Sequence, residues 1–453
     1  MTHIFRSYDI RGIYGSDLTD DIMRRIGMSF AAFSKKDVVL SRDSRLSSPA
    51  LSSAFASGAS SAGTRVIDAG ILPMGAGMFH AWKSGTEFAY ITGSHLPKEW
   101  GGVKFFHANG IGFKESENAA IRDIFLNNSV AEKNGSVENA GDGVVDSYVN
   151  YLNDRIKSSR RLSIVVDNGN GVSSIVSRKL FSRAGHELDV IFEEPDGNFP
   201  NRLPDPIDRE LGKLKKIVSN YDIGIAYDGD SDRMAVVDEK GHLLSAEQTS
   251  YIILSKLMGN VDGPIVANVE CTRLIDDIAG RFSRKVIRAP VGHTFLMQYV
   301  NDNSACYGVE PTGHYCIPSI VPFDDAVTIS LYMVSAVSEA EETLSEMVKE
   351  MPAHGFERLS FECPDSIKFD VMAALKEKIM KRFGNAITID GVRVDMENGW
   401  SLLRVSNTSP YIRLTIEGST RKDSMEIRKE FVGIMKEEFD SRGLEMKEEH
   451  GKK

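Results

Sequence analysis

The chain has 453 residues, of which 42% are hydrophobic and 26% charged, and its formal net charge is −10. This composition is typical of a soluble globular protein of about two to four domains, and the acidic balance argues against a nucleic-acid-binding surface. No run of about 18 apolar residues marks a membrane helix, and the N-terminus lacks the apolar core of a signal peptide. The four scattered cysteines predict neither a zinc site nor disulfides. We therefore expect a cytoplasmic protein without nucleic-acid or membrane partners.

The first third of the chain alternates strand-like and helix-like segments. This rhythm predicts a largely parallel sheet covered by helices. A stretch rich in Asn, Gly and charge, 127–142, has the composition of a domain boundary. The expected strands are 38–40, 64–68 and 88–92, and the expected helices are 50–62 and 74–82.

A loop of small and polar residues follows the apolar segment 88–91 and contains Ser94. In an open α/β sheet, ligands bind at the carboxyl ends of the strands. Ser94 has His95 as its neighbour, and Lys98 and Lys104 follow closely. A serine in this setting can act as a nucleophile, or it can carry a phosphate that the cations stabilise. A polar loop with a chance Ser–His pair is the alternative.

A second α/β cycle begins with the strand 162–166 and continues with the strand 223–227 and a hairpin over 234–244. Between the last two lies the most specific local signal of the chain, three aspartates at alternating positions. Such a loop gathers several hard oxygens around one point, as Mg²⁺ or Ca²⁺ requires. An EF-hand is disfavoured because its sixth position is not Gly, and a plain acidic turn stays open as an alternative. The residues are Asp228, Asp230, Asp232 and, at the sixth position, Arg233, which would polarise phosphoryl oxygens.

A third cycle starts with the strand 265–269 and includes strands 286–288 and 304–308. Glu310, Thr312 and His314 follow at alternating positions, so they could point into one cleft. A carboxylate, a hydroxyl and an imidazole suit a hydroxyl-rich ligand such as a sugar. Taken alone, the pattern is more typical of a polar loop.

From about residue 358 the pattern changes to a small α+β domain. Two arginines flank a run of hydroxyl and amide side chains over 404–413. Guanidinium groups with hydroxyl and backbone N–H donors would form a phosphate cradle, and a tight turn is the alternative. The charged tail 446–453 is expected to fray. The expected helices are 369–383 and 425–439, and the expected strands are 386–389, 391–394, 400–405 and 411–417.

Taken together and in order, these stretches resemble the α-D-phosphohexomutase family, of the phosphomannomutase/phosphoglucomutase type. The serine loop corresponds to 92–97, the metal loop to 228–233, the sugar loop to 310–314 and the phosphate loop to 404–410. The N-terminal segment 8–12 also fits the family. The resemblance covers nearly the whole chain.

The resemblance implies an α/β protein of three similar mixed α/β domains followed by a smaller α+β C-terminal domain, around a central cleft. The expected domains are a phosphoserine domain at 1–142, a metal domain at 143–252, a sugar domain at 253–360 and a phosphate domain at 361–453.

It also implies residue roles. Ser94 would carry a phosphoryl group, and Mg²⁺ would be held by Asp228, Asp230, Asp232 and a phosphoryl oxygen on Ser94. Lys104 would assist proton transfer and balance phosphoryl charge. The groups expected near the phosphate are His95, Arg11 and Arg233. The residues expected to hold the distal phosphate are Arg404, Ser406, Asn407, Thr408 and, less directly matched, Arg413. The residues expected at the sugar are Gly292, His293, Glu310, Thr312 and His314.

Departures from the family pattern at Leu96, Gly93, Thr312 and Ser231 are mild. Glu270 differs more, because some family members carry a lysine there, and this reversal of charge puts a sugar or phosphate contact in doubt.

The implied activity is that of a mutase which interconverts hexose 6-phosphate and hexose 1-phosphate through a hexose 1,6-bisphosphate. Mannose and glucose phosphates are the expected substrates. A phosphoglucosamine mutase and a Mg²⁺-dependent sugar phosphatase are the alternatives. The sequence leaves the choice of sugar, the pathway and the oligomeric state, monomer or homo-oligomer, open.

Overall fold

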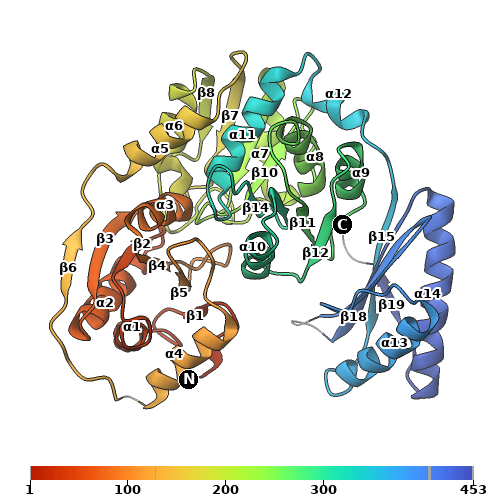
Figure 1. Cartoon of the computed structure of the whole chain (residues 1–453), viewed down its shortest axis with the longest axis horizontal. Coiled ribbons are helices and arrows are strands. Elements are labelled where there is room, and N and C mark those ends of the chain that lie inside the picture. Colours follow the sequence, from red (N-terminus) through yellow and green to blue (C-terminus); the bar gives the residue numbers. More distant parts are fainter. Residues whose placement is uncertain (1, 128, 407–409, 451–453) are drawn as a thin grey trace.

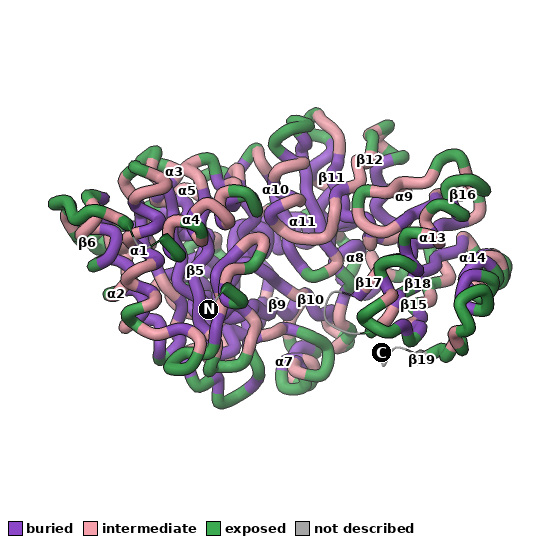
Figure 2. The backbone as a smooth tube through the Cα atoms, turned by 90° about the horizontal axis from the view of Figure 1, so that it is seen from below, coloured by how far each residue is buried: buried purple, intermediate pink, exposed green. Residues whose placement is uncertain are grey.

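The computed structural model describes residues 2–127, 129–406 and 410–450. Four β-sheets follow one another along this chain and lie in an arc, from the N-terminal sheet on the left of Figure 1 to the C-terminal sheet on the right. Each sheet is formed by one continuous part of the sequence. Figure 2 shows that buried backbone is concentrated in the sheets and the helices between them, whereas the edge strand β6 (Ser136–Asn139) is exposed.

The first sheet has the strand order β1-β5-β4-β2-β3-β6. The neighbours β4, β2, β3 and β6 are parallel, whereas β5 runs antiparallel to both β4 and β1. The expected parallel sheet covered by helices is confirmed. The expected boundary segment contains an additional strand, β6, because Ser136–Asn139 pairs with β3. The remaining elements of this part are β1 (Ile10–Ile13), α1 (Asp20–Ser34), β2 (Val38–Arg42), α2 (Ser48–Ser61), β3 (Arg65–Ile71), α3 (Met74–Ser84), β4 (Glu87–Ile91), β5 (Trp100–Phe106) and α4 (Glu115–Asn127).

Alternation along the central strands explains the layers around this sheet. Leu40 and Ile91 lie in a core with α1, α2 and α4, whereas Val39 and Tyr90 face α3. The core on the α3 side of the sheet continues without interruption into the second and third sheets. Because strand side chains alternate between faces, β2 and β4 are buried on both sides, which fits the apolar runs 38–40 and 88–91 within them.

The second and third sheets share one plan, in which parallel strands carry a single antiparallel edge strand. Their orders are β10-β9-β7-β8 and β12-β11-β13-β14. The expected hairpin over 234–244 is confirmed in part. Its arms meet through one antiparallel bridge, Val237 to Leu243, and the backbone N–H groups of Leu244 and Asp238 donate to the carbonyl oxygens of Val236 and His242, whereas the full-length partner of β10 is β9. The strands are β7 (Ser163–Asp167), β8 (Glu187–Ile191), β9 (Ile223–Tyr227), β10 (Met234–Val237), β11 (Ile265–Asn268), β12 (Val286–Ala289), β13 (Tyr307–Val309) and β14 (Tyr315–Cys316). The helices are α5 (Val144–Arg155), α6 (Ser177–Arg183), α7 (Gly212–Ile217), α8 (Ala246–Leu257), α9 (Leu274–Arg281), α10 (His293–Asp302), α11 (Ala326–Glu339) and α12 (Leu344–Lys349).

The fourth sheet is antiparallel throughout, with the order β16-β17-β18-β15-β19. Two expectations were wrong here. Part of the tail forms a strand that pairs with β15, and the segment 386–389 contributes only a bridge from Ile387 to Arg393. The elements are β15 (Gly355–Glu362), α13 (Lys368–Arg382), β16 (Val392–Met396), β17 (Gly399–Val405), β18 (Tyr411–Gly418), α14 (Arg421–Ser441) and β19 (Glu448–His450).

Helix α14 begins four residues earlier than the apolar pattern predicts. Thr420 and Asp423 form a capping box, in which each side chain accepts a hydrogen bond from the backbone N–H of the other. Such a box satisfies N–H groups that the first turn leaves unpaired. The start of the helix is therefore set by polar capping.

The fourth sheet meets the third at the loop that follows β11. Arg393 is buried, and its Nη1 donates to the carbonyl oxygens of Val269 (2.7 Å) and Cys271 (3.0 Å). Its guanidinium also lies 3.9 Å from the ring centroid of Trp400. The last part of the chain is thus joined to the third by buried polar contacts.

Across the described residues, no helix has both the length and the apolar content that a bilayer crossing requires. Cys271, Cys306, Cys316 and Cys363 are buried free thiols.

Candidate active site

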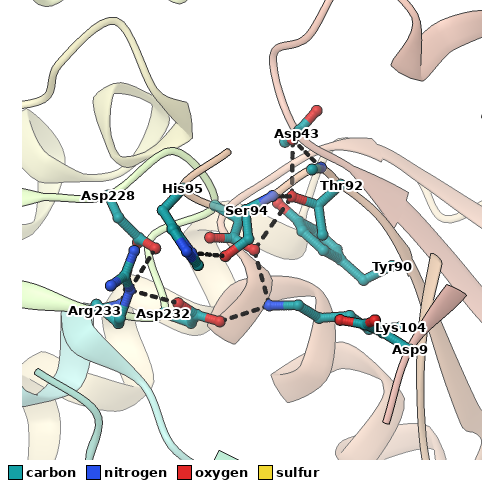
Figure 3. A network of polar contacts seen from close by, with 12 residues as sticks. Asp9, Asp43, Tyr90, Thr92, Ser94, His95, Lys104, Asp228, Asp232 and Arg233 are labelled. Carbon is teal, nitrogen blue, oxygen red and sulfur yellow. Dashed lines mark hydrogen bonds and ion pairs between the residues drawn. The ribbon is translucent and has the colours of Figure 1, made fainter. Parts of the chain in front are cut away.

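The loop that carries Ser94 connects the antiparallel strands β4 and β5. Ser94 is buried, and its φ of 51° places it in the left-handed region that a non-glycine residue rarely adopts. Its backbone N–H donates to Thr92 Oγ1 at 2.7 Å, and its Oγ lies 3.4 Å from His95 Nδ1 (Figure 3). The serine is held in one strained conformation, and strain of this kind concentrates at functional sites.

Three carboxylates meet in the turn between β9 and β10. Asp228, Asp230 and Asp232 each offer one oxygen within 4.8 Å of the others, and all three side chains are buried. Asp230 Oδ1 and Asp232 Oδ1 have no hydrogen-bond partner among the described residues. Buried carboxylate oxygens without partners are costly, and a divalent cation would satisfy them. The donor set therefore fits Mg²⁺.

Lys104 on β5 joins the first sheet to this carboxylate cluster. Its Nζ lies 3.0 Å from Asp230 Oδ2 and 2.7 Å from Asp232 Oδ2, and Figure 3 shows it extending toward Asp232. Burial alone would lower the pKa of Lys104, but the two carboxylates outweigh burial and raise it. Lys104 is thus held as a cation, which suits the balancing of phosphoryl charge.

Arg233 is the second cation at the cluster. Its Nε lies 3.1 Å from Asp228 Oδ2, and its Nη2 lies 3.3 Å from Asp205 Oδ1. Burial would lower the pKa of Arg233, and the Asp228, Asp232 and Asp205 carboxylates raise it instead. The guanidinium stays charged beside the Ser94 loop.

His95 and Arg11 are the other two groups expected near Ser94, and Figure 3 shows His95 between Ser94 and Arg233. Burial, together with the positive charges of Arg233 and Arg11, lowers the pKa of His95 to about 3. His95 is therefore neutral at physiological pH and can donate one hydrogen bond and accept another. Arg11 lies on β1, opposite Gly102 of β5, and its Nε is 2.5 Å from Asp9 Oδ2.

A pair of histidines shares one buried carboxylate in the third part of the chain. His314 Nδ1 lies 3.0 Å and His293 Nδ1 3.6 Å from Asp324 Oδ2, and the two rings stack with centroids 5.2 Å apart. Burial would raise the pKa of Asp324, but the two histidines hold it below its usual range. Burial lowers the pKa of His314, and Asp232 and Asp324 raise it overall.

The remaining residues of the expected sugar loop, Glu310 and Thr312, lie together, because Thr312 Oγ1 donates to Glu310 Oε2 at 3.4 Å. Glu310 is buried and accepts from the backbone N–H of Gly292 at 2.6 Å and from Asn268 Nδ2 at 3.2 Å. Thr312 is exposed. A cavity of about 660 Å³ opens beside Thr312. Its lining includes Asp205, Arg233, Glu270, Thr312 and Phe356, from the second, third and fourth parts of the chain.

The expected phosphate loop follows β17. Arg404 is half-buried there, with Nη1 2.7 Å from Glu270 Oε1 and Nε 3.0 Å from Asp390 Oδ1. Arg413 lies directly opposite Arg404 on β18 and is exposed. Ser406 is buried, and its Oγ has no partner among the described residues. The structure thus gives Arg404 two carboxylate partners, one of which is the unusual Glu270.

Two further predicted residues, Asn407 and Thr408, lie outside the described residues.

Sequence reasoning missed Asp43, Asp324 and Asp390, which each hold a predicted site residue or its loop. The sequence held a local signal for Asp324. Two aspartates precede α11, and because the N-cap role needs only Asp325, the neighbouring Asp324 is free for another function. Asp43 and Asp390 are single acids in polar loops, and only the fold brings them to their partners.

Models of the phosphoglucomutase/phosphomannomutase family match the chain in four successive segments. The models of its alpha/beta/alpha domains I, II and III match residues 2–132, 146–241 and 245–354, and the model of its C-terminal domain matches 359–434. The chain belongs to this family. The resemblance inferred from the five motifs is confirmed, as are the fold class and the class of enzyme, an isomerase of the phosphohexomutase type.

Individual relatives match over almost their whole length. A probable phosphoglucosamine mutase of Methanosarcina acetivorans is 31% identical over 430 residues, which cover 93% of this chain and 96% of that protein. A phosphomannomutase/phosphoglucomutase of Pseudomonas syringae pv. tomato is 30% identical over 447 residues, which cover 96% and 95%. The crystal structure of a family protein from Burkholderia thailandensis has a TM-score of 0.89 at 28% identity and covers 98% of this chain and 99% of that one.

Proposed function

We propose that this protein interconverts hexose 6-phosphate and hexose 1-phosphate, with mannose and glucose phosphates as substrates and hexose 1,6-bisphosphate as intermediate and activator. One observation carries the proposal. Ser94 sits in a strained loop whose neighbour Lys104 reaches 2.7 Å to a buried cluster of three aspartates from a different sheet. A phosphoryl carrier, a cation and a metal-binding cluster in one place are the parts that phosphoryl transfer requires.

The reaction follows as two transfers. The phosphoryl group on Ser94 passes to the free hydroxyl at one end of the sugar phosphate. The bond from phosphorus to Ser94 Oγ breaks, a new bond forms to the sugar oxygen, and the proton of the sugar hydroxyl ends on Ser94 Oγ, which becomes a free hydroxyl. The bisphosphate then turns end for end, and Ser94 Oγ takes the other phosphoryl group. Neutral His95, 3.4 Å from Ser94 Oγ, is suited to exchange the serine proton.

The cations around Ser94 serve the charge that moves in these steps. Mg²⁺ would be held by Asp228, Asp230, Asp232 and a phosphoryl oxygen on Ser94, and it would supply a concentrated positive charge at that phosphoryl group. Lys104 and Arg233 would contact the remaining phosphoryl oxygens. Arg404, Ser406, Asn407, Thr408 and Arg413 would form the holding subsite for the other phosphate. Gly292, His293, Glu310, Thr312 and His314 would shape the sugar subsite, in which Glu310 acts by holding Gly292 in place.

The domain limits 1–142, 143–252, 253–360 and 361–453 are part of the proposal. A cytoplasmic setting is consistent with four buried free thiols, which a reducing compartment preserves.

A second candidate is a phosphoglucosamine mutase, because relatives with that printed name match this chain as well as those named for mannose and glucose. It uses the same site and differs only in the sugar. Mannose, glucose and glucosamine 6-phosphates assayed side by side decide between the two, since kcat/KM should be highest for the true substrate.

The test of the common mechanism is Ser94→Ala. We expect the variant to fold and to lose mutase activity by at least a factor of about 10³, because the phosphoryl carrier is gone. Intact-mass spectrometry should find one phosphoryl group on the wild type and none on the variant. Activity within tenfold of wild type, measured with the bisphosphate present, would contradict the proposal, and steady release of inorganic phosphate by the wild type would indicate a phosphatase.

A further inference from the structure

A buried arginine lies directly beneath the Ser94 loop. Arg45 belongs to the connection between β2 and α2, and it is 1% exposed. Its Nη2 donates to the carbonyl oxygens of Ser94 and Leu96, both at 2.6 Å. Its Nη1 donates to those of Pro97 at 2.6 Å and Trp100 at 3.2 Å. One side chain therefore binds four carbonyl groups of the segment that carries the serine.

The fifth donor of this guanidinium binds Asp43. Arg45 Nε lies 3.0 Å from Asp43 Oδ2, and both side chains are fully buried. An arginine has five N–H donors in a fixed plane, so all of them have an acceptor here. The pairing also balances the charge, which makes the burial of the cation tolerable.

Asp43 binds the beginning of the same loop. Its Oδ2 accepts from Thr92 Oγ1 at 2.8 Å and from the backbone N–H of Gly93 at 3.3 Å, and Figure 3 shows Asp43 next to Thr92. Its Oδ1 accepts from Ser48 Oγ at 2.5 Å, which fixes the carboxylate to the first turn of α2. Asp43 and Arg45 thus hold the loop from residue 92 to residue 100.

The loop depends on this support for two reasons. Ser94 has a φ of 51°, which costs energy in a non-glycine residue unless its surroundings enforce it. Without Arg45, the four carbonyl groups would also lose a buried donor, and among them Pro97 alone is shown to accept another backbone hydrogen bond, from the N–H of Trp100. Gly93 fits the same arrangement, because a Cβ atom there would lie 2.6 Å from Arg45 Cζ.

We propose that Arg45, oriented by Asp43, is a positioning residue for phosphoryl transfer at Ser94. It touches neither the sugar subsite nor the aspartate cluster. It sets the backbone conformation that directs Ser94 Oγ toward His95 and the cluster. The inference rests on the proposed function, in which Ser94 carries the phosphoryl group. Its consequence is that the geometry of the reacting serine depends on a residue far from it in sequence.

The test is Arg45→Lys, which keeps the charge but has three donors in place of five and no planar fork. We expect kcat to fall about 10- to 100-fold, because small misplacements of reacting groups have effects of this size. KM for the hexose phosphate should stay within about twofold, since the holding subsite lies in another part of the chain. The ³¹P resonance of the Ser94 phosphoserine should shift or broaden.

Arg393→Lys is the matched control, because Arg393 is also fully buried and also binds two carbonyl groups and a carboxylate, but at the fourth sheet. Arg393→Lys should lose about as much thermal stability as Arg45→Lys, and it should leave the ³¹P resonance of the Ser94 phosphoserine unchanged. If Arg45→Lys does not fold, Ser48→Ala, which removes the hydrogen bond from Ser48 Oγ to Asp43 Oδ1, should lower kcat about two- to fivefold and should also shift or broaden the ³¹P resonance.

An Arg45→Lys protein that is folded, with kcat within twofold of wild type and an unchanged ³¹P resonance, would overturn the inference. If Arg45→Lys does not fold, unchanged kcat and ³¹P resonance in Ser48→Ala would do the same. Failure of the proposed function is a different result, because the wild type itself would then carry no phosphoryl group on Ser94.

Discussion

At the scale of single residues, the site is organised by buried carboxylates that hold its cations and histidines. Asp324 is the clearest case, because one oxygen faces both His293 and His314. A protonated histidine can donate from both ring nitrogens. Asp324 therefore favours a charged His314, whose second nitrogen would then be a donor toward an anionic ligand. The chemistry of the histidine depends on a carboxylate that the sequence motif does not include.

Asp324→Asn should lower the pKa of His314, because one of the three carboxylates that raise it, those of Asp232, Asp324 and Glu310, is removed. A raised histidine pKa stabilises the fold at low pH, and this contribution disappears as the pH rises through the folded-state pKa. The variant should therefore be destabilised by about 2 kcal/mol at pH 6. The deficit should be smaller at pH 9. The measurements are an NMR titration of His314 in the metal-free protein and urea unfolding at both pH values.

Asp277→Asn is the control for this experiment. It removes a different carboxylate–histidine contact, 2.7 Å from His354 Nε2, and should leave the His314 titration unchanged. A His314 pKa that is the same in Asp324→Asn and wild type would show that Asp324 does not set the charge of the histidine.

At the scale of elements, the sequence predicted the central strands and missed contacts that only the fold creates. Apolar runs such as 223–227 are buried on both faces and correspond to β9. The edge strands β6 and β19 were missed, because their polar sequences form strands only by pairing with β3 and β15. The site followed the same rule. Local motifs located Ser94 and the aspartates, whereas the partners of Arg404 come from the distant loops after β11 and before β16.

The contact between Glu270 and Arg404 leads to a prediction about substrate affinity. If Arg404 holds the distal phosphate, as proposed, that phosphate must compete with the Glu270 carboxylate 2.7 Å away. Glu270→Gln removes the competing charge. We expect KM for the hexose phosphate to fall about three- to tenfold, the range that corresponds to about 1 kcal/mol for a partly exposed ion pair. Steady-state kinetics with and without added inorganic phosphate provide the measurement.

Two variants complete this test. Arg404→Ala should raise KM, because the cation itself is lost. Asp276→Asn, which breaks the nearby ion pair with Arg288, should change KM by less than twofold. An increase of KM in Glu270→Gln would mean that Glu270 orients Arg404 for the phosphate and does not compete with it.

At the scale of the whole molecule, the fourth sheet must be placed correctly against the other three if the phosphate subsite proposed for it is to serve Ser94. Arg393 provides much of that placement, through the carbonyl groups of Val269 and Cys271 and the ring of Trp400. Burial, together with the charge of Arg288, lowers the pKa of Arg393 to about 10. The lowered pKa shows that burial has a free-energy cost for the charged form of this side chain. Asp395, 2.8 Å from Arg393 Nη2, offsets part of that cost.

Arg393→Met should loosen this junction while leaving each sheet folded. The side chain keeps much of the volume but leaves two buried carbonyl groups without donors, for which we expect a loss of about 3 kcal/mol. Amides in the loop after β11 and in β16 and β17 should exchange hydrogen faster, and the radius of gyration from small-angle scattering should increase. KM should rise, because the distal phosphate subsite would be less well placed. Arg382→Met is the control, since Arg382 is mostly exposed and is paired with Glu430 on a helix of the same part of the chain, and it should change stability by less than about 0.5 kcal/mol. Exchange rates at the junction that match those of wild type would show that the fourth sheet is positioned by other contacts.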